Sequence, residues 1–428
     1  MGFIIYTFFA ILLSILSVLS AKYSIGSLEY PLFFLFLIVS LVYVMKFKIR
    51  LVKSYRQLFL IYVFLISVNT MLSKYSPSLP YSVIGAVITI LPFLLFIVSY
   101  NYKFTFKQIN KFIDIWIYMI LIFLFIAYAE TFVFNTATPG SAIVSISVLK
   151  FGFFASMCNQ ALLLSLFKYS ISKQRRYKYI IVFLTISIIL FVQLKVILGS
   201  LIIYFIYFLY VLDISRFKKK IYSVFVVFLG VILMSSIGFL MTKISRYYYM
   251  YGDESSIEDI ARTALYYQGM NISNDFFPLG SGQGTYGSIP VNIVYSQVYV
   301  DYNLSYVGGL GKDSEEDYKM DTHWASILGE NGYLGTFLYL LLFFFPLRFL
   351  KKMKSGEITH SSSFKFLLIS SLLVISIESF VLSLPTRFCF MFIYAGLNAI
   401  ICRYITENIN INNKYESITG YNELSDKE

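Results

Sequence analysis

His323 stands where the longest polar stretch of the chain gives way to an apolar one, in "DTHWASILGENGYLGTF", residues 321–337. It is one of only two histidines in 428 residues. It falls in the first turn of a predicted membrane helix capped by Thr322 or Asp321, where the helix dipole disfavours a second proton on the ring. A neutral imidazole at the outer membrane boundary can accept a hydroxyl proton, so His323 is a candidate general base. The competing interpretation is a satisfied interfacial histidine beside Trp324 in an aromatic belt.

Glu330 follows seven residues later, two turns down the same face of the predicted helix. A carboxylate at that depth in a membrane is costly and should face the protein interior. Glu330 is therefore the second candidate catalytic residue. Gly332 and Gly335 are predicted to let this helix pack closely against a neighbour.

Arg262 lies in "SSIEDIARTALYYQG", which has the pattern of an amphipathic helix. Ser255 and Glu258 have capping-box spacing, and apolar residues recur at helical intervals. Arg262 lies off the apolar face and is a candidate ligand for an anionic group. The competing interpretation is an exposed pair with Glu258 one turn earlier, which would be solvated surface decoration.

The stretch "FFPLGSGQGTYGSIP" places glycines at 282, 284 and 287, which matches G-x-G-x-x-G. No strand–helix–strand unit surrounds it, so we reject a dinucleotide-binding interpretation. The glycines instead predict a tight turn with exposed backbone N–H groups. Such a turn is able to cup an anion.

The composition indicates a membrane protein that crosses the bilayer many times. Hydrophobic residues make up 58% of the chain, charged residues 14%, and the mean hydropathy is +0.72. The net charge is +12, but the basic residues cluster in short loops between apolar segments, which argues against a nucleic-acid partner. All three cysteines fall in apolar segments, which argues against a disulfide framework or a metal site.

Twelve apolar segments are long enough to be predicted as membrane helices. The first is expected to be a retained helix and not a signal peptide, because it lacks a basic n-region. Basic clusters in alternate loops predict that both termini are cytoplasmic. The segments lie near 3–20, 31–46, 57–73, 81–99, 112–134, 142–167, 178–194, 197–212, 221–242, 323–347, 364–383 and 388–402.

The predicted organisation has four parts. Residues 1–242 hold nine membrane helices, and residues 243–322 form a large extracytoplasmic loop that is more acidic than basic. Residues 323–402 hold three further membrane helices. The polar, Asn-rich tail 403–428 is expected to be cytoplasmic and disordered.

This arrangement resembles the O-antigen polymerase and O-antigen ligase superfamily, whose members have about twelve membrane helices and one large outer loop late in the chain. The segment "ARTALYYQGMNISNDFFPLGSGQGTYGSIP" is similar to the family's arginine followed by a proline–glycine run. The segment "THWASILGENGYLGTF" is similar to its H-x6-E-x-G-x2-G pattern. Members often carry an arginine in an earlier outer segment. Here Lys195 stands in "QLKVILGS", and a lysine holds phosphate as a point charge without the bidentate fork.

The resemblance implies a metal-independent glycosyltransferase in the bacterial inner membrane that needs no cofactor. The donor would be a polyprenyl-diphosphate-linked oligosaccharide, which brings its own leaving group, and the acceptor would be a sugar hydroxyl. His323 and Glu330 would act in catalysis. The cations available for the diphosphate are Arg262, Lys195, Arg246 and Arg387. Membrane lipid, a chain-length regulator and a flippase are the expected partners.

Two other functions stay open from the sequence. A ligase would move the glycan onto a lipid or protein acceptor. A transporter or flippase of lipid-linked glycan would need polar residues within several membrane helices, and Glu130, Gln160 and Glu378 are the few candidates. Repeat-unit polymerase is the leading hypothesis by analogy of fold and motif.

Overall fold

The computed structural model describes residues 2–23, 29–45, 52–76, 78–132, 153–190, 194–211, 257–314, 317–353 and 359–409. Helices and no strands occur in these ranges. The helices are α1 (Gly2–Tyr23), α2 (Glu29–Met45), α3 (Lys53–Leu72), α4 (Leu79–Tyr100), α5 (Phe106–Phe132), α6 (Phe153–Ser172), α7 (Arg175–Leu190), α8 (Leu194–Tyr210), α10 (Ile257–Asp275), α11 (Ile289–Ile293), α12 (Gln297–Asp301), α13 (His323–Phe343), α14 (Ser361–Glu378) and α15 (Phe388–Met391).

Six helical segments of the described residues are long and apolar enough to cross a membrane. They are Lys53–Leu72, Leu79–Tyr100, Phe106–Ile126, His323–Lys352, Ser361–Glu378 and Phe388–Ile409. Shorter apolar helices occur at Gly2–Ser17, Glu29–Ser40 and Lys195–Tyr210. The chain is thus an all-α membrane protein, whereas the expected total of twelve spans stays a prediction. The predicted span 221–242 lies outside the described residues.

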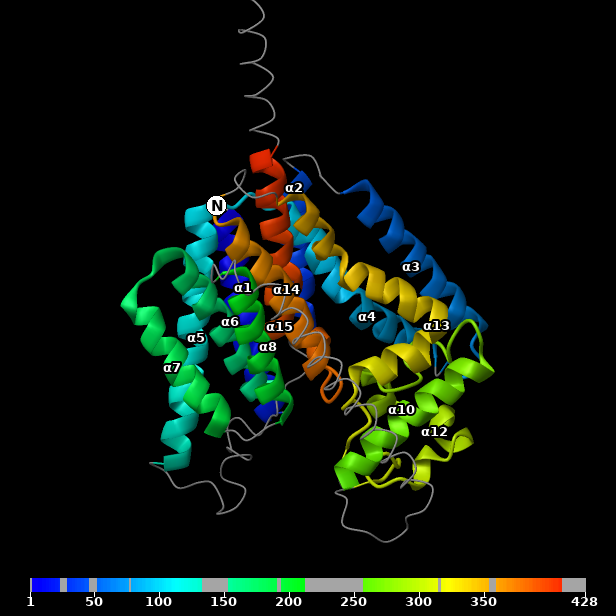
Figure 1. Ribbon diagram of the computed structural model, residues 1–428. Helices are drawn as coiled ribbons and strands as arrows, with labels where there is room; N and C mark the ends of the chain where they lie inside the picture. Colours follow the sequence, from blue (N-terminus) through cyan, green and yellow to red (C-terminus); the bar gives the residue numbers. More distant parts are fainter. Residues whose placement is uncertain are drawn as a thin grey trace, which may run out of the picture.

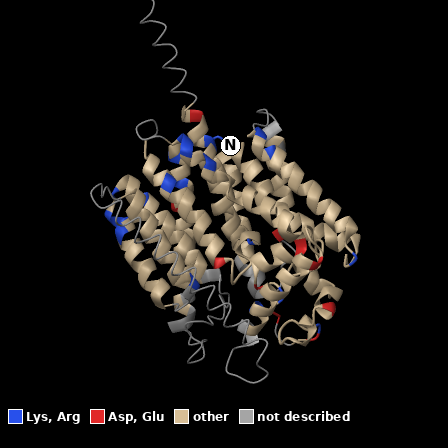
Figure 2. Cartoon of the chain, turned by 45° about the vertical axis from the view of Figure 1, so that its right-hand side comes forward, with Lys and Arg blue, Asp and Glu red and all other residues tan. Residues whose placement is uncertain are grey.

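The helices form a bundle with the extra helices of the late loop at one end (Figure 1). Lys and Arg gather at the opposite end, which also holds the N-terminus, and most Asp and Glu lie towards the loop (Figure 2). A large apolar core runs through the bundle, and a second core lies under the loop around Ala261, Leu265 and Ile272 of α10. The predicted apolar face of the 255–269 segment is therefore confirmed at Ala261, Ala264 and Leu265, which are fully buried.

Helix α13 is not one straight span, because its backbone leaves the helical conformation at Gly332 (φ 63°, ψ −168°). The two arms fold back on each other, so the rings of Trp324 and Phe343 lie 5.8 Å apart between centroids. In a straight helix nineteen residues would separate these rings by about 28 Å. Gly332 does allow a close approach, since a Cβ there would lie 2.3 Å from the Leu279 carbonyl carbon, but it also has a φ of 63° that favours glycine and reverses the chain direction, which was not predicted.

The glycine-rich segment of the late loop fills the break in α13. Backbone N–H groups of Ser281 and Gly282 donate to the carbonyls of Gly329 and Glu330 at 2.8 and 3.1 Å. The Leu334 N–H donates to the Pro278 carbonyl at 3.2 Å. Irregular backbone is tolerated next to a bilayer only where protein satisfies its polar groups, and this segment does so. The 243–322 region is therefore not wholly a separate outer loop, because its glycine segment is built into the bundle.

The last helical segment extends further than predicted. A single π-type turn at Phe392–Leu397 follows α15, and the helical segment Phe388–Ile409 continues past residue 402. Arg403 is buried and pairs with Glu407 at 2.5 Å one turn later. The expected disordered tail therefore does not begin at residue 403, and residues 410–428 lie outside the described part.

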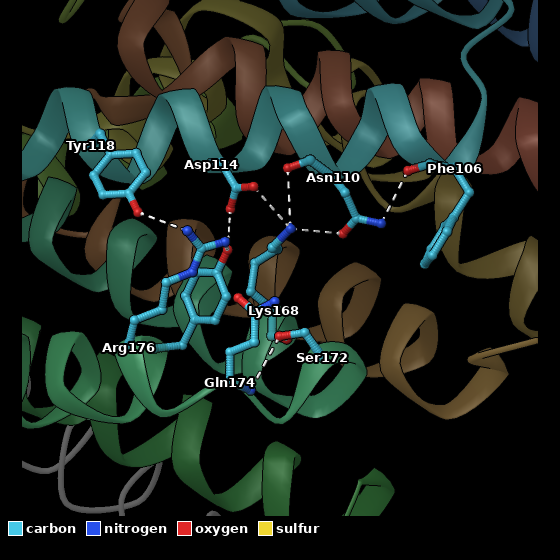
Figure 3. A network of polar contacts seen from close by, with 9 residues as sticks. Phe106, Asn110, Asp114, Tyr118, Lys168, Ser172, Gln174 and Arg176 are labelled. Carbon is cyan, nitrogen blue, oxygen red and sulfur yellow. Dashed lines mark hydrogen bonds and ion pairs between the residues drawn. The ribbon is translucent and has the colours of Figure 1, made fainter.

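A polar clamp ties α5, α6 and α7 together at the basic end (Figure 3). The buried Lys168 ammonium lies 3.1 Å from the Asp114 carboxylate and donates to the Asn110 side chain at 3.2 Å. The Tyr177 hydroxyl donates to the other Asp114 oxygen at 2.5 Å. Arg176 in turn donates to the Tyr177 hydroxyl at 2.8 Å. A buried charge needs partners of this kind, so the cluster explains how three helices hold a common register.

Candidate active site

The imidazole of His323 makes its hydrogen bond with a residue that the sequence pattern did not single out. Nε2 lies 3.0 Å from the Tyr339 hydroxyl on the opposite arm of α13. The side chain is 3% exposed, with the Trp324 ring against one edge. The expected water-facing histidine is therefore a buried one, held by the fold-back at Gly332.

The end of α14 supports this first turn of α13. The His323 backbone N–H donates to the Ser379 carbonyl at 3.3 Å, and the Trp324 indole N–H donates to the Ser376 carbonyl at 2.8 Å. Thr322 occupies the N-cap position as predicted, but its side chain accepts no capping hydrogen bond. The histidine is positioned by packing against α14 instead of by a side-chain cap.

Arg262 pairs with a residue far away in the sequence. One guanidinium nitrogen lies 2.9 Å from the Asp321 carboxylate, and the two side chains are only 17% and 24% exposed. Arg262 is therefore mostly buried, while the side chain of Glu258, its partner in the competing interpretation, lies outside the described part of the chain. The neighbouring Tyr266 donates its hydroxyl to the Phe380 carbonyl at 2.9 Å, and burial raises the pKa of that phenol. Because Asp321 precedes His323 by two residues, the predicted anion ligand and the predicted base share one region.

Lys195 belongs to the first turn of α8, which packs against α14. It acts electrostatically on the buried Glu378 carboxylate, which accepts a hydrogen bond from the Asn159 side chain at 2.6 Å. A narrow cavity lies beside this group, and Gln160 and Tyr394 are among its lining residues. The Ser379 carbonyl, which accepts the His323 N–H, directly follows Glu378, so the end of α14 contacts His323 and also carries the carboxylate on which Lys195 acts.

The other two predicted cations do not join this region in the described residues. Arg246 lies outside them. Arg387 begins the last helical segment and acts electrostatically on Tyr30 and Cys389, together with Glu29 of α2. Arg387 is thus assigned to the α2–α15 contact, and it is not brought to His323.

Glu330 faces the protein interior as predicted, and its carboxylate is hydrogen-bonded to the glycine-rich turn. Its carboxylate oxygen Oε1 accepts backbone N–H groups from Thr285 at 2.9 Å and Tyr286 at 3.0 Å, and the Ser288 hydroxyl at 2.6 Å. The predicted anion cup therefore exists, and the anion it holds is a side chain of the protein itself. This geometry favours an anchoring role for Glu330 over a catalytic one.

Helices α3 and α4 complete the support of this turn. Asn69 of α3 donates to the Glu330 carbonyl at 2.7 Å. Gln283 donates to the Asn331 side chain at 2.7 Å and accepts the Thr89 hydroxyl of α4 at 3.1 Å. The backbone of Gly284 lies close to Gly85 of α4: a Cβ added to Gly85 would lie 2.7 Å from the backbone nitrogen of Gly284. No signal in the sequence paired these distant residues.

No family model matches this chain, and no curated protein matches it. Among the described residues, no group of three or more His, Cys, Asp or Glu side chains is arranged to hold a metal ion. The candidate site consists of three groups near the last turn of α14: His323, the pair Arg262–Asp321, and Lys195 with Glu378.

Proposed function

We propose that the chain is a membrane glycosyltransferase that polymerises lipid-linked oligosaccharide repeat units. The observation that carries the proposal is the gathering of His323, Arg262 and Lys195 around the end of α14. This end of the bundle lies opposite the basic end (Figure 2). By the positive-inside rule the site then faces the outer side of the inner membrane, where lipid-linked glycans are joined without nucleotide donors.

In the proposed reaction the bond between the donor sugar and its diphosphate breaks. A hydroxyl oxygen of the acceptor sugar forms the new glycosidic bond, and its proton passes to His323. The polyprenyl diphosphate leaves with the bonding electron pair, and Arg262 and Lys195 stabilise its charge. Each atom and charge is then accounted for by groups of the substrates and of this chain.

The carboxylate partners of both cations support an exchange on donor binding. Arg262 lies 2.9 Å from Asp321, and Lys195 acts on Glu378. A diphosphate is a stronger multivalent acceptor than a single carboxylate, so it can take over the guanidinium from Asp321. The carboxylates thus occupy the cations until the donor arrives, which keeps buried charge paired in the free enzyme.

A second candidate function is transport of the lipid-linked glycan. The observation that favours it is the buried polar cluster of Asn159, Gln160 and Glu378 beside a cavity within the bundle. Buried ionisable and amide side chains at membrane depth are typical of substrate or ion pathways.

One experiment separates these functions. Purified protein in lipid nanodiscs is incubated with lipid-linked repeat units, and the products are separated by size. A ladder of products supports the polymerase, and a single addition to another acceptor supports a ligase. Unchanged substrate, with movement of the lipid-linked glycan across vesicles, supports the transporter and overturns the proposal.

A further inference from the structure

We propose that Tyr339 is a positioning residue that caps Nε2 of His323 and thereby commits the reaction to Nδ1. This inference rests on the proposed function, in which His323 accepts the acceptor proton. The sequence offers no reason to pair residues 323 and 339, because sixteen residues of straight helix would place them about 24 Å apart. The reversal at Gly332 brings the hydroxyl and Nε2 to 3.0 Å.

The tyrosine cannot easily move away from the histidine. Its side chain is fully buried, and its ring packs edge-on against Phe93 at 4.9 Å and stacks on Phe343 at 6.3 Å between centroids. Water has no access to replace a lost partner. In the described part of the chain no side chain or backbone group hydrogen bonds to Nδ1. Nδ1 is therefore the ring nitrogen left for a substrate.

The proposed base role requires one of the two tautomers of the neutral ring. Nδ1 has a lone pair for an incoming proton only when the neutral ring carries its own proton on Nε2. In that tautomer the Nε2–H donates to the Tyr339 oxygen at 3.0 Å, close to the usual N–H···O separation of about 2.9–3.0 Å, whereas in the other tautomer the phenol donates to Nε2. After Nδ1 takes the acceptor proton, the imidazolium keeps the same bond to Tyr339. The phenol thus plays for His323 the role that an orienting group plays for any histidine base.

The chain offers a matched control for the loss of this hydroxyl. Tyr62 is also fully buried, and its ring lies 6.1 Å from that of Tyr339. Among the described residues its hydroxyl has no hydrogen-bond partner. Tyr62→Phe and Tyr339→Phe therefore make the same chemical change in the same apolar cluster, but only the second removes a bond to His323.

The decisive measurement does not depend on activity. The chain has only two histidines, so nitrogen NMR of ¹⁵N-histidine-labelled full-length protein in nanodiscs gives two imidazoles. The substitution His360→Asn removes the second imidazole, so that only the His323 signals remain. Asn is chosen because it tolerates the left-handed backbone at this position (φ 64°). We expect His323 to carry its proton on Nε2 in this background, and Tyr339→Phe to shift the proton towards Nδ1, whereas Tyr62→Phe leaves it unchanged. A proton on Nδ1 in the protein with Tyr339 intact would overturn the proposal.

Turnover supplies the second readout. Tyr339→Phe should lower the rate at saturating lipid-linked donor about tenfold, as expected for one lost hydrogen bond, with an unchanged KM for donor. Tyr62→Phe should keep the full rate. Equal rates for the two variants would overturn the positioning role. If the wild-type protein forms no glycan bond but the tautomer results hold, the proposed function fails while the assignment of Tyr339 to Nε2 stands.

Discussion

The Glu330 carboxylate accepts the backbone N–H of Tyr286 at 3.0 Å, across the break in α13. The same oxygen accepts the Thr285 N–H and the Ser288 hydroxyl. A carboxylate that is 1% exposed stands at the centre of a glycine turn, so the turn and the helix break stabilise each other. This glycine turn also holds in place the N-terminal arm of α13, which carries His323.

Glu330→Gln should therefore act first on stability. The substitution removes the charge that strengthens three hydrogen bonds, and a charge-assisted bond is worth about 1.5–3 kcal/mol. We expect a lower melting temperature in detergent and faster proteolysis of the 278–288 segment, with activity falling in step with folded protein. A Gln variant that melts like wild type but makes no product would show instead that Glu330 acts in the chemistry.

Gly332→Ala should prevent the fold-back of α13. A Cβ at this position would lie 2.3 Å from the Leu279 carbonyl carbon, and the backbone φ of 63° disfavours L side chains. We expect a large loss of folded protein, measured by size-exclusion chromatography of the detergent-solubilised chain. Gly335→Ala separates the two causes, because Gly335 has no left-handed φ but its Cβ would also lie 2.6 Å from the Cβ of Asn331. If the Gly332 variant matches wild type in yield and melting, the reversal does not need glycine.

Arg262→Lys should lose most donor binding, because an ammonium cannot reproduce the bidentate guanidinium fork on a diphosphate. Glu258→Ala should change little. Asp321→Asn should lower the KM for lipid-linked donor, since it removes the carboxylate that competes for Arg262 at 2.9 Å. Should Asp321→Asn weaken donor binding as much as Arg262→Lys, the pair is structural and the proposed exchange is wrong.

Reporter fusions along the chain test the orientation that the site needs. Fusions at residue 300 should report the outer side, and those at residues 175 and 355 should report the cytoplasm, because the basic loops stay inside. As a control, immunoblots of the membrane fraction should show that each fusion protein is intact, so that the reporter signal does not come from a cleaved reporter. An inside signal at residue 300 would place His323 and Arg262 in the wrong compartment for the proposed donor.

Local patterns were enough to predict the helices and the direction in which some residues face. Hydropathy located the long apolar helices, and helical spacing predicted the buried face of α10 at Ala261 and Leu265. The glycine spacing predicted a turn able to cup an anion, although the anion itself was not identified. These features depend on residues within one or two turns of each other.

Contacts between distant segments account for what could not be predicted. Helical periodicity assumes a continuous helix, so the reversal at Gly332 hid the contact of His323 with Tyr339. Arg262 pairs with Asp321, which lies 59 residues away in the sequence. Lys195 reaches Glu378 from another helix. In each case packing of whole helices decided the partner, and one sequence carries no record of that packing.

The most direct test of the account is product formation by three variants of His323 at saturating lipid-linked donor. His323→Ala removes the ring, His323→Gln keeps a polar group near Nε2 for Tyr339, and His323→Asn keeps one near Nδ1. The account predicts that all three lose glycan ladders by about 10²–10⁴-fold while membrane insertion and donor binding persist, because neither amide is a base. Any of the three proteins that still makes ladders near the wild-type rate would contradict the account: an active Gln or Asn variant would leave His323 as a positioning group, and an active Ala variant would leave it as a packing residue of the fold-back.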